Sequence, residues 1–175
     1  MDHRELAERV RASAYLEGEF TLRSGRKSRF YLDKYLFETE PDILAALGQA
    51  FARHVGPTTT RIAGAELGGV ALAAAASMAS GRPFVIVRNA RKDYGTGKAF
   101  EGRLNPGDVV LLVEDVATTG GQVLEAADVI RQAGAAVEKI VAVIDRGQGA
   151  RANIENAGYR FEAILTAADL RLPAE

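Results

Sequence analysis

VVLLVEDVATTGGQ, residues 109–122, is the stretch from which the fold of this chain is best predicted. Its first five residues are apolar and rich in valine, and the run is too short for a helix, which is typical of a strand buried on both faces of a parallel sheet. The run ends in Glu114 and Asp115, and a Thr/Gly turn then leads into a helical pattern. Polar groups in this position lie at the carboxyl edge of the sheet, where α/β proteins bind ligands. The stretch therefore predicts an α/β fold with a ligand site at the turn.

The residues of this turn suit the two ends of a sugar phosphate. Gly120 and Gly121 let the backbone approach a ligand, and exposed N–H groups at a helix start favour phosphate. The hydroxyls of Thr118 and Thr119 can add hydrogen bonds to the same oxygens. Two adjacent carboxylates repel phosphate, but they accept hydrogen bonds from a ribose diol. The alternative is a structural turn in which the aspartate caps the helix and the glutamate is solvated.

Residues 110–122 resemble the phosphoribosyl diphosphate (PRPP) motif of the type I phosphoribosyltransferases. Two residues depart from the motif: Ala117 is smaller than the usual aliphatic residue, and Gln122 replaces the usual small or hydroxylic one. The resemblance implies a mostly parallel central sheet flanked by helices, a small N-terminal hood and a flexible loop. It also implies PRPP as a substrate. The PRPP-binding residues that it implies in this motif are Glu114, Asp115, Ala117, Thr118, Thr119, Gly120, Gly121 and Gln122.

A basic and aromatic hairpin is predicted over FTLRSGRKSRFYLDKY, residues 20–35, with strands at 20–23 and 30–34. Its cations and rings suit a planar anionic ring with a carboxylate, although an ordinary hairpin with core aromatics explains the same pattern. The run F-T-L-x-S-G-x-x-S followed by aromatics resembles the hood of the orotate phosphoribosyltransferases. Arg23 stands where many of those enzymes carry lysine. The orotate-binding residues implied by the resemblance are Arg23, Phe30, Tyr31, Thr118 and Arg146.

The segment ELGG, residues 66–69, joins a predicted strand to a predicted helix. A tight glycine turn at the carboxyl edge can offer backbone N–H groups to a pyrophosphate, or it can serve only as a connection. In the family that the chain resembles, this position is the pyrophosphate loop. The resemblance therefore implies pyrophosphate contacts from Glu66, Leu67 and Gly68.

The segment 88–107 has no apolar periodicity and more basic than acidic residues. Such a long loop predicts a mobile functional segment whose charge stabilises a leaving group, with a merely solvated loop as the alternative. In orotate phosphoribosyltransferases a comparable loop closes over PRPP and commonly reaches a partner subunit's site. The resemblance implies PRPP contacts from Arg88, Lys92 and Tyr94. It implies that the catalytic groups are Lys92, Arg88 and Asp115.

The remaining pattern predicts one domain over residues 1–175, with the hood mainly in 1–40. Helices are expected over 3–17, 41–55, 70–80, 121–133 and 149–157, and further strands over 61–65, 84–88, 137–144 and 159–166.

Composition argues against several classes of protein. The formal net charge of −1, from 22 basic and 23 acidic residues, gives no electrostatic case for nucleic acid or an anionic membrane. The chain has no cysteine for a disulfide or thiolate site, and its two histidines are far apart. We expect a cytoplasmic protein, because no signal peptide or apolar run of ~18 residues is present. Neither the P-loop pattern nor the nucleophile elbow G-x-S-x-G occurs.

The resemblance thus implies an orotate phosphoribosyltransferase that makes orotidine 5′-monophosphate (OMP) and pyrophosphate for pyrimidine (UMP) synthesis. It also implies a homodimer that shares the loop 88–107 between subunits. Mg²⁺ is expected to bind through PRPP oxygens, with no direct protein ligand. Two alternatives remain, namely a phosphoribosyltransferase for a purine or uracil, and a regulator that binds PRPP without turnover.

Overall fold

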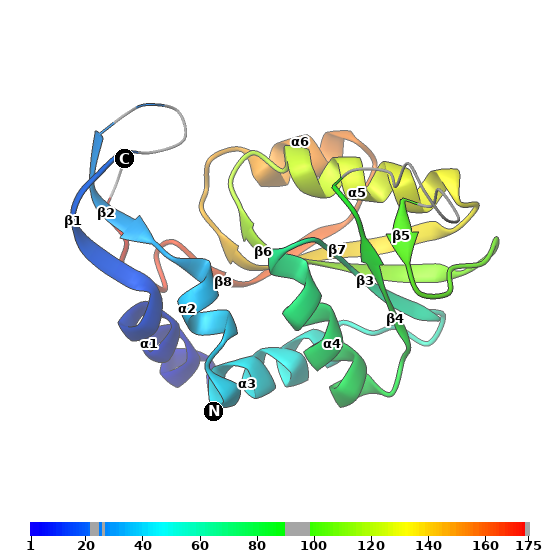
Figure 1. Ribbon diagram of the computed structural model, residues 1–175, viewed down its shortest axis with the longest axis horizontal. Helices are drawn as coiled ribbons and strands as arrows, with labels where there is room; N and C mark the ends of the chain where they lie inside the picture. The colour runs from blue at the N-terminus through cyan, green and yellow to red at the C-terminus, as the bar shows by residue number, and fades with distance from the viewer. Residues whose placement is uncertain (22–24, 26, 90–98, 174–175) are drawn as a thin grey trace.

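The computed structural model describes residues 1–21, 25, 27–89 and 99–173, and its centre is a six-stranded sheet in the order β5-β4-β3-β6-β7-β8 (Figure 1). Neighbouring strands are parallel except β4 and β5, which pair antiparallel. The strands are β3 (Arg61–Ala65), β4 (Phe84–Val87), β5 (Phe100–Glu101), β6 (Val109–Ala117), β7 (Ala136–Asp145) and β8 (Phe161–Thr166). The predicted α/β class with a mostly parallel sheet is confirmed.

Helices cover both faces of this sheet (Figure 1). On one face lie α3 (Pro41–Ala52) and α4 (Gly68–Ser80), and on the other lie α5 (Gly121–Gln132) and α6 (Ala150–Asn156). Alternate residues of β6 enter the two resulting cores: Leu111 and Val113 join one, and Val110 and Leu112 join the other. All four side chains are at most 1% exposed, and burying each contributes about 1.5–3 kcal/mol. The apolar run predicts this placement because a strand alternates its side chains between faces.

The hood lies at one end of the molecule, on the left in Figure 1. It consists of α1 (His3–Ala14), an antiparallel pair of strands and a short helix. The strands are β1 (Tyr15–Thr21) and β2 (Lys27–Leu32), and the helix is α2 (Lys34–Glu38). Stacking of Tyr15 on Phe30, with ring centroids 5.5 Å apart, joins the two strands.

Four boundaries predicted in the hood were wrong. The two strands begin earlier than residues 20 and 30, at Tyr15 and Lys27, because their pairing runs from Tyr15–Leu32 to Thr21–Lys27. The other two are the ends of the first helix and of the second strand. The first helix ends at Ala14 instead of residue 17, because Tyr15 turns to an extended conformation and pairs with Leu32. The second strand ends at Leu32, because the Asp33 side chain accepts a hydrogen bond from the Tyr35 N–H and caps α2, a helix that was not predicted. The predicted strand 20–23 extends into residues 22 and 23, which lie outside the described residues.

Outside the hood, the predicted elements are present, with boundaries shifted by up to four residues. The central strand was predicted to end at residue 113, but β6 continues to Ala117 because β7 supplies parallel partners as far as Asp145. Within the segment 88–107, predicted to lack regular structure, β5 pairs with β4, and residues 90–98 lie outside the described residues. No helix among the described residues is long and apolar enough to cross a membrane.

The start of α4 lies unusually close to β3. A Cβ on Gly64 would lie only 2.0 Å from the carbonyl oxygen of Gly69 and 2.6 Å from its carbon. Only glycine allows this approach of one backbone to another. The approach fixes the first turn of α4, and with it the segment 66–69, beside the carboxyl end of β6.

Candidate active site

A hollow of about 210 Å³ lies at the carboxyl end of β6, where the strand turns into α5. The residues that line it are Glu114 and 116–123. The turn is held from its carbonyl side: the Ala150 N–H donates to the Thr118 carbonyl at 3.0 Å, and the Asn153 side chain donates to the Thr119 carbonyl at 2.9 Å. Gly120, with a φ of 81°, precedes the first turn of α5, which has no side-chain cap. The turn therefore presents helix N–H groups at the hollow, as an anion site requires.

The two predicted carboxylates lie side by side at this edge, and their side chains interact with each other. Glu114 is 8% exposed and lines the hollow, whereas Asp115 is 3% exposed. Burial, followed by the neighbouring Asp115 charge, raises the pKa of Glu114 well above its usual value. The alternative that Asp115 caps the helix is wrong, because Gly120 is the N-cap of α5. The alternative that Glu114 is solvated is also wrong, because this residue is buried.

Asp115 is held by α2 and by its own strand. Its Oδ2 accepts a hydrogen bond from the Lys34 ammonium at 2.5 Å, and its Oδ1 accepts one from the Val116 N–H. A Cβ on Gly68 would lie 1.6 Å from that same Oδ2. The carboxylate therefore packs directly on the backbone where α4 begins.

Two further titratable groups of α2 surround Asp115. Burial lowers the pKa of Lys34, but the charges of Asp115, Tyr35 and Glu114 outweigh it, so the net shift is upward. Glu38 is 3% exposed, and its Oε1 has no hydrogen-bond partner among the described residues. Burial, followed by the Asp115 charge, raises the pKa of Glu38 to about 8. Near neutral pH this part of the site therefore contains a neutral Glu38 and a charged Lys34.

The segment 66–69 contacts both neighbouring loops. Arg88 Nη1 lies 4.0 Å from Glu66 Oε2 and 3.5 Å from Glu101 Oε1. The Gln122 side chain donates to the Glu66 carbonyl at 3.5 Å, which joins this segment to the turn after β6. The Glu66–Leu67 peptide bond is cis, and the Leu67 side chain is 66% exposed. The structure thus brings the predicted pyrophosphate loop next to Arg88 and the predicted phosphate turn.

The predicted orotate residues are only partly brought together. The Arg146 guanidinium lies 5.6 Å from the ring centroid of Phe30, so the carboxyl end of β7 meets the hood. Tyr31 is on the other face of β2, 44% exposed and packed on Phe20 at 5.6 Å. The neighbouring residue, Asp145, lies 3.9 Å from Arg151.

Three predicted site residues, Arg23, Lys92 and Tyr94, lie outside the described residues, so their contacts stay predictions. Sequence reasoning missed Lys34 and Glu38. Asp33 followed by a lysine and a glutamate four residues apart is a signal for a short capped helix. No signal in the sequence indicated that this helix contacts Asp115, 81 residues further along the chain.

Comparison with known proteins gives a consistent result. A family model described as the phosphoribosyl transferase domain matches residues 38–164. The orotate phosphoribosyltransferase of Haloquadratum walsbyi is 45% identical over 164 residues, which cover 94% of this chain and 89% of that protein. Crystal structures of Mycobacterium tuberculosis orotate phosphoribosyltransferase superpose with TM-scores of 0.90 at 33% identity and, for its complex with PRPP, 0.84 at 32% identity. In both, the match covers 98% of this chain and 100% of the other.

Proposed function

The chain belongs to the orotate phosphoribosyltransferases of the phosphoribosyl transferase domain family, and we propose that it transfers the 5-phosphoribosyl group of PRPP to orotate. The products are OMP and pyrophosphate, in pyrimidine synthesis. The observation that carries this proposal is the hollow shared by Glu114 and the Thr118–Gly121 turn, in a chain of this family.

The PRPP molecule has three parts that match three neighbouring structures. The 5′-phosphate accepts hydrogen bonds from the N–H groups and hydroxyls of the Thr118–Gly121 turn, at the start of α5. The ribose hydroxyls donate to Glu114 and Asp115. The pyrophosphate lies at the segment 66–69, with Arg88 alongside.

Orotate fits between the hood and the carboxyl end of β7. Arg146 can donate to the orotate carboxylate in a bidentate manner, and Phe30, on which its guanidinium lies, sets its position. Arg23, Tyr31 and Thr118 are proposed to complete this part of the site.

The reaction breaks the bond between C1 of the ribose and the pyrophosphate oxygen and forms a bond from C1 to the orotate nitrogen. The proton that this nitrogen loses leaves with the pyrophosphate. Positive charge develops on the sugar and negative charge on the pyrophosphate. Glu114 and Asp115 fix the sugar, while Arg88, together with Lys92, stabilises the leaving group. Lys92→Ala should therefore depress turnover far more than PRPP affinity, and equal losses of the two would contradict this role.

We propose that Mg²⁺ binds through the pyrophosphate and ribose oxygens of PRPP. Magnesium commonly keeps water and substrate phosphates as ligands instead of using an all-protein cage. Within the described residues, no group of three or more His, Asp or Glu side chains is arranged to hold a metal ion. When bound, Mg²⁺ would neutralise part of the pyrophosphate charge.

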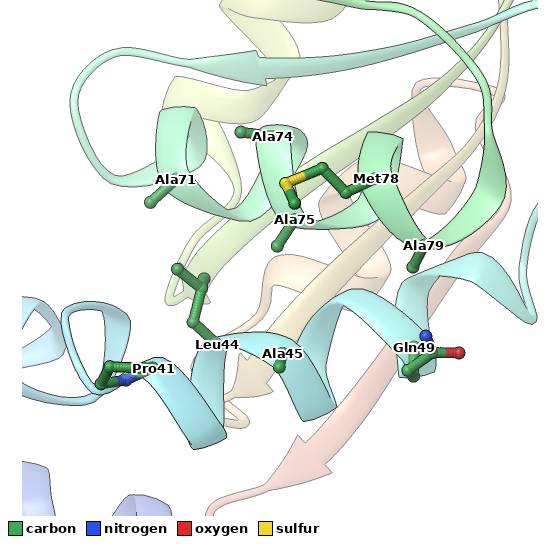
Figure 2. Close-up of a pocket in the computed structure, with 9 residues that line it drawn as sticks. All are labelled: Pro41, Leu44, Ala45, Gln49, Ala71, Ala74, Ala75, Met78 and Ala79. Atoms are coloured by element: carbon green, nitrogen blue, oxygen red, sulfur yellow. The ribbon is translucent and has the colours of Figure 1, made fainter.

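We also propose a homodimer formed through an apolar groove between α3 and α4. The groove, of about 550 Å³, is lined mainly by alanines, with Leu44 projecting from α3 toward α4 and Met78 on α4 (Figure 2). Met78 is 88% exposed, and such an apolar surface marks an interaction site. Because α4 starts at the pyrophosphate segment, a second copy seated here would lie close to the substrate site. Sharing of the loop 88–107 stays a prediction.

The dimer is tested by the molar mass in solution. Met78→Glu should convert the dimer to a monomer, whereas Leu36→Glu, on the exposed side of α2, should leave it unchanged. A wild-type monomer would contradict the homodimer, and a dimeric Met78→Glu variant would contradict this surface.

The activity is tested by following orotate consumption with PRPP and Mg²⁺, beside adenine, hypoxanthine and uracil as competing acceptors. We expect turnover with orotate and with none of the other three bases. One pyrophosphate should be released for each OMP formed. Preference for another base would favour a different phosphoribosyltransferase. PRPP binding without pyrophosphate release would favour a regulator.

A further inference from the structure

The side chain of Lys34 reaches from the hood to the middle of the PRPP site. Its ammonium donates to Asp115 Oδ2 at 2.5 Å, and a Cβ on Gly68 would lie 3.1 Å from the same nitrogen. The ammonium therefore lies over the backbone of the first residue of α4. With its side chain 30% exposed, Lys34 is open to the solvent side of the site.

The segment 66–69 lacks positive charge of its own. Its sequence, Glu-Leu-Gly-Gly, contains one acid and no base, whereas a pyrophosphate carries several negative charges. Arg88 supplies a cation at the Glu66 end, 4.0 Å from that carboxylate. At the Gly68 end, among the described residues, Lys34 brings an ammonium to within 3.1 Å of a Cβ built on Gly68, from another part of the sequence.

We propose that Lys34 is a pyrophosphate-binding residue, which reaches the segment 66–69 from the hood helix α2 and supplies the positive charge that this segment lacks. The proposal rests on the proposed function of the site. An ammonium has three N–H donors, so Lys34 can bond Asp115 and still donate to a pyrophosphate oxygen.

The groups around Lys34 leave its charge available. Asp115 and Glu114 face it from β6, and Asp33, Tyr35 and Glu38 belong to α2 or its cap. The raised pKa of Glu38 keeps this carboxyl largely neutral near pH 7, and the carboxyl that Lys34 bonds is that of Asp115. The raised pKa of Lys34 itself keeps the ammonium protonated throughout the neutral range.

The test compares two ligands, pyrophosphate with Mg²⁺ and OMP, whose binding to the full chain is measured by calorimetry. OMP contains the ribose hydroxyls and the 5′-phosphate but no pyrophosphate. Lys34→Met should weaken the binding affinity for pyrophosphate at least tenfold, which is about the effect of one charge-assisted hydrogen bond. It should weaken the affinity for OMP less than threefold. Lys34→Arg, which keeps the charge, should retain most of the pyrophosphate affinity.

Lys139→Met is the matched control, because Lys139 is also a partly buried lysine in an ion pair, 2.6 Å from Glu162 near the amino ends of β7 and β8. It should leave both affinities unchanged. Should Lys34→Met fail to fold, Lys34→Gln carries the same comparison with a shorter polar side chain.

Two results would overturn the proposal. Equal losses of OMP and pyrophosphate affinity would show that Lys34 acts only by orienting Asp115 for the ribose. Unchanged pyrophosphate affinity would show that Lys34 does not contact this ligand. Failure of the proposed function looks different, because the wild-type chain would then bind these ligands without consuming orotate.

Discussion

Gly68→Ala is expected to disable the site while leaving the fold intact. The new methyl group would lie 1.6 Å from Asp115 Oδ2 and 2.7 Å from its Cγ. Non-bonded heavy atoms normally approach to about 3.5 Å, so the carboxylate must move by roughly 2 Å. That movement breaks its charge-assisted bond to Lys34, which costs about 1.5–3 kcal/mol. A misplacement of about 1 Å can already cost roughly 100-fold in rate, so we expect kcat/KM to fall by about 100- to 1,000-fold.

The assay is the initial rate of orotate consumption with PRPP and Mg²⁺, measured beside the thermal midpoint of each variant. Gly81→Ala is the matched control at the other end of α4, where Gly81 has a φ of 71° and a Cβ would meet nothing within 4 Å. It should lose about 1 kcal/mol of stability and keep kcat/KM within about twofold. A Gly68→Ala enzyme with wild-type kcat/KM would contradict this prediction, because it would show that Asp115 tolerates displacement.

Three other substitutions test the fold, the buried acid and the base site. Gly64→Ala would place a Cβ 2.0 Å from the Gly69 carbonyl oxygen. It should therefore lower the free energy of unfolding in urea by about 3 kcal/mol or more. A loss below about 1 kcal/mol would be inconsistent with this close approach. For Glu38, whose folded-state pKa of about 8 exceeds the usual 4.5, the wild type should lose stability relative to Glu38→Gln as pH rises from about 4.5 to 8, because the folded state disfavours ionisation. A difference in melting temperature that does not change with pH would rule this out. Arg146→Gln should raise the KM for orotate by roughly 10- to 100-fold and the KM for PRPP much less, because it removes the proposed partner of the orotate carboxylate. A larger effect on the KM for PRPP would place Arg146 elsewhere in the site.

The sequence predicts the sheet well because its strands are buried on both faces and therefore read as continuous apolar runs. The phosphate turn is also predictable, since Thr118, Thr119 and the two glycines form a local pattern between a strand and a helix. What was missed depends on partners distant in the chain. The extension of β6 to Ala117 requires β7, and the end of α1 at Ala14 requires pairing of Tyr15 with Leu32.

The acidic pair shows the same limit within the site. Its position at the carboxyl edge follows from the sequence, but the burial of both carboxylates follows only once the strand is known to continue past Val113. Nothing in the sequence relates Lys34 or Glu38 to Asp115, because that contact arises from packing of α2 beside α4 and β6.

The most direct test of this site is a crystal structure of the protein with OMP. We expect the 5′-phosphate within hydrogen-bonding distance of the Thr118–Gly121 N–H groups, with the ribose hydroxyls on Glu114 and Asp115. A phosphate held elsewhere, with those N–H groups facing only solvent, would contradict this expectation.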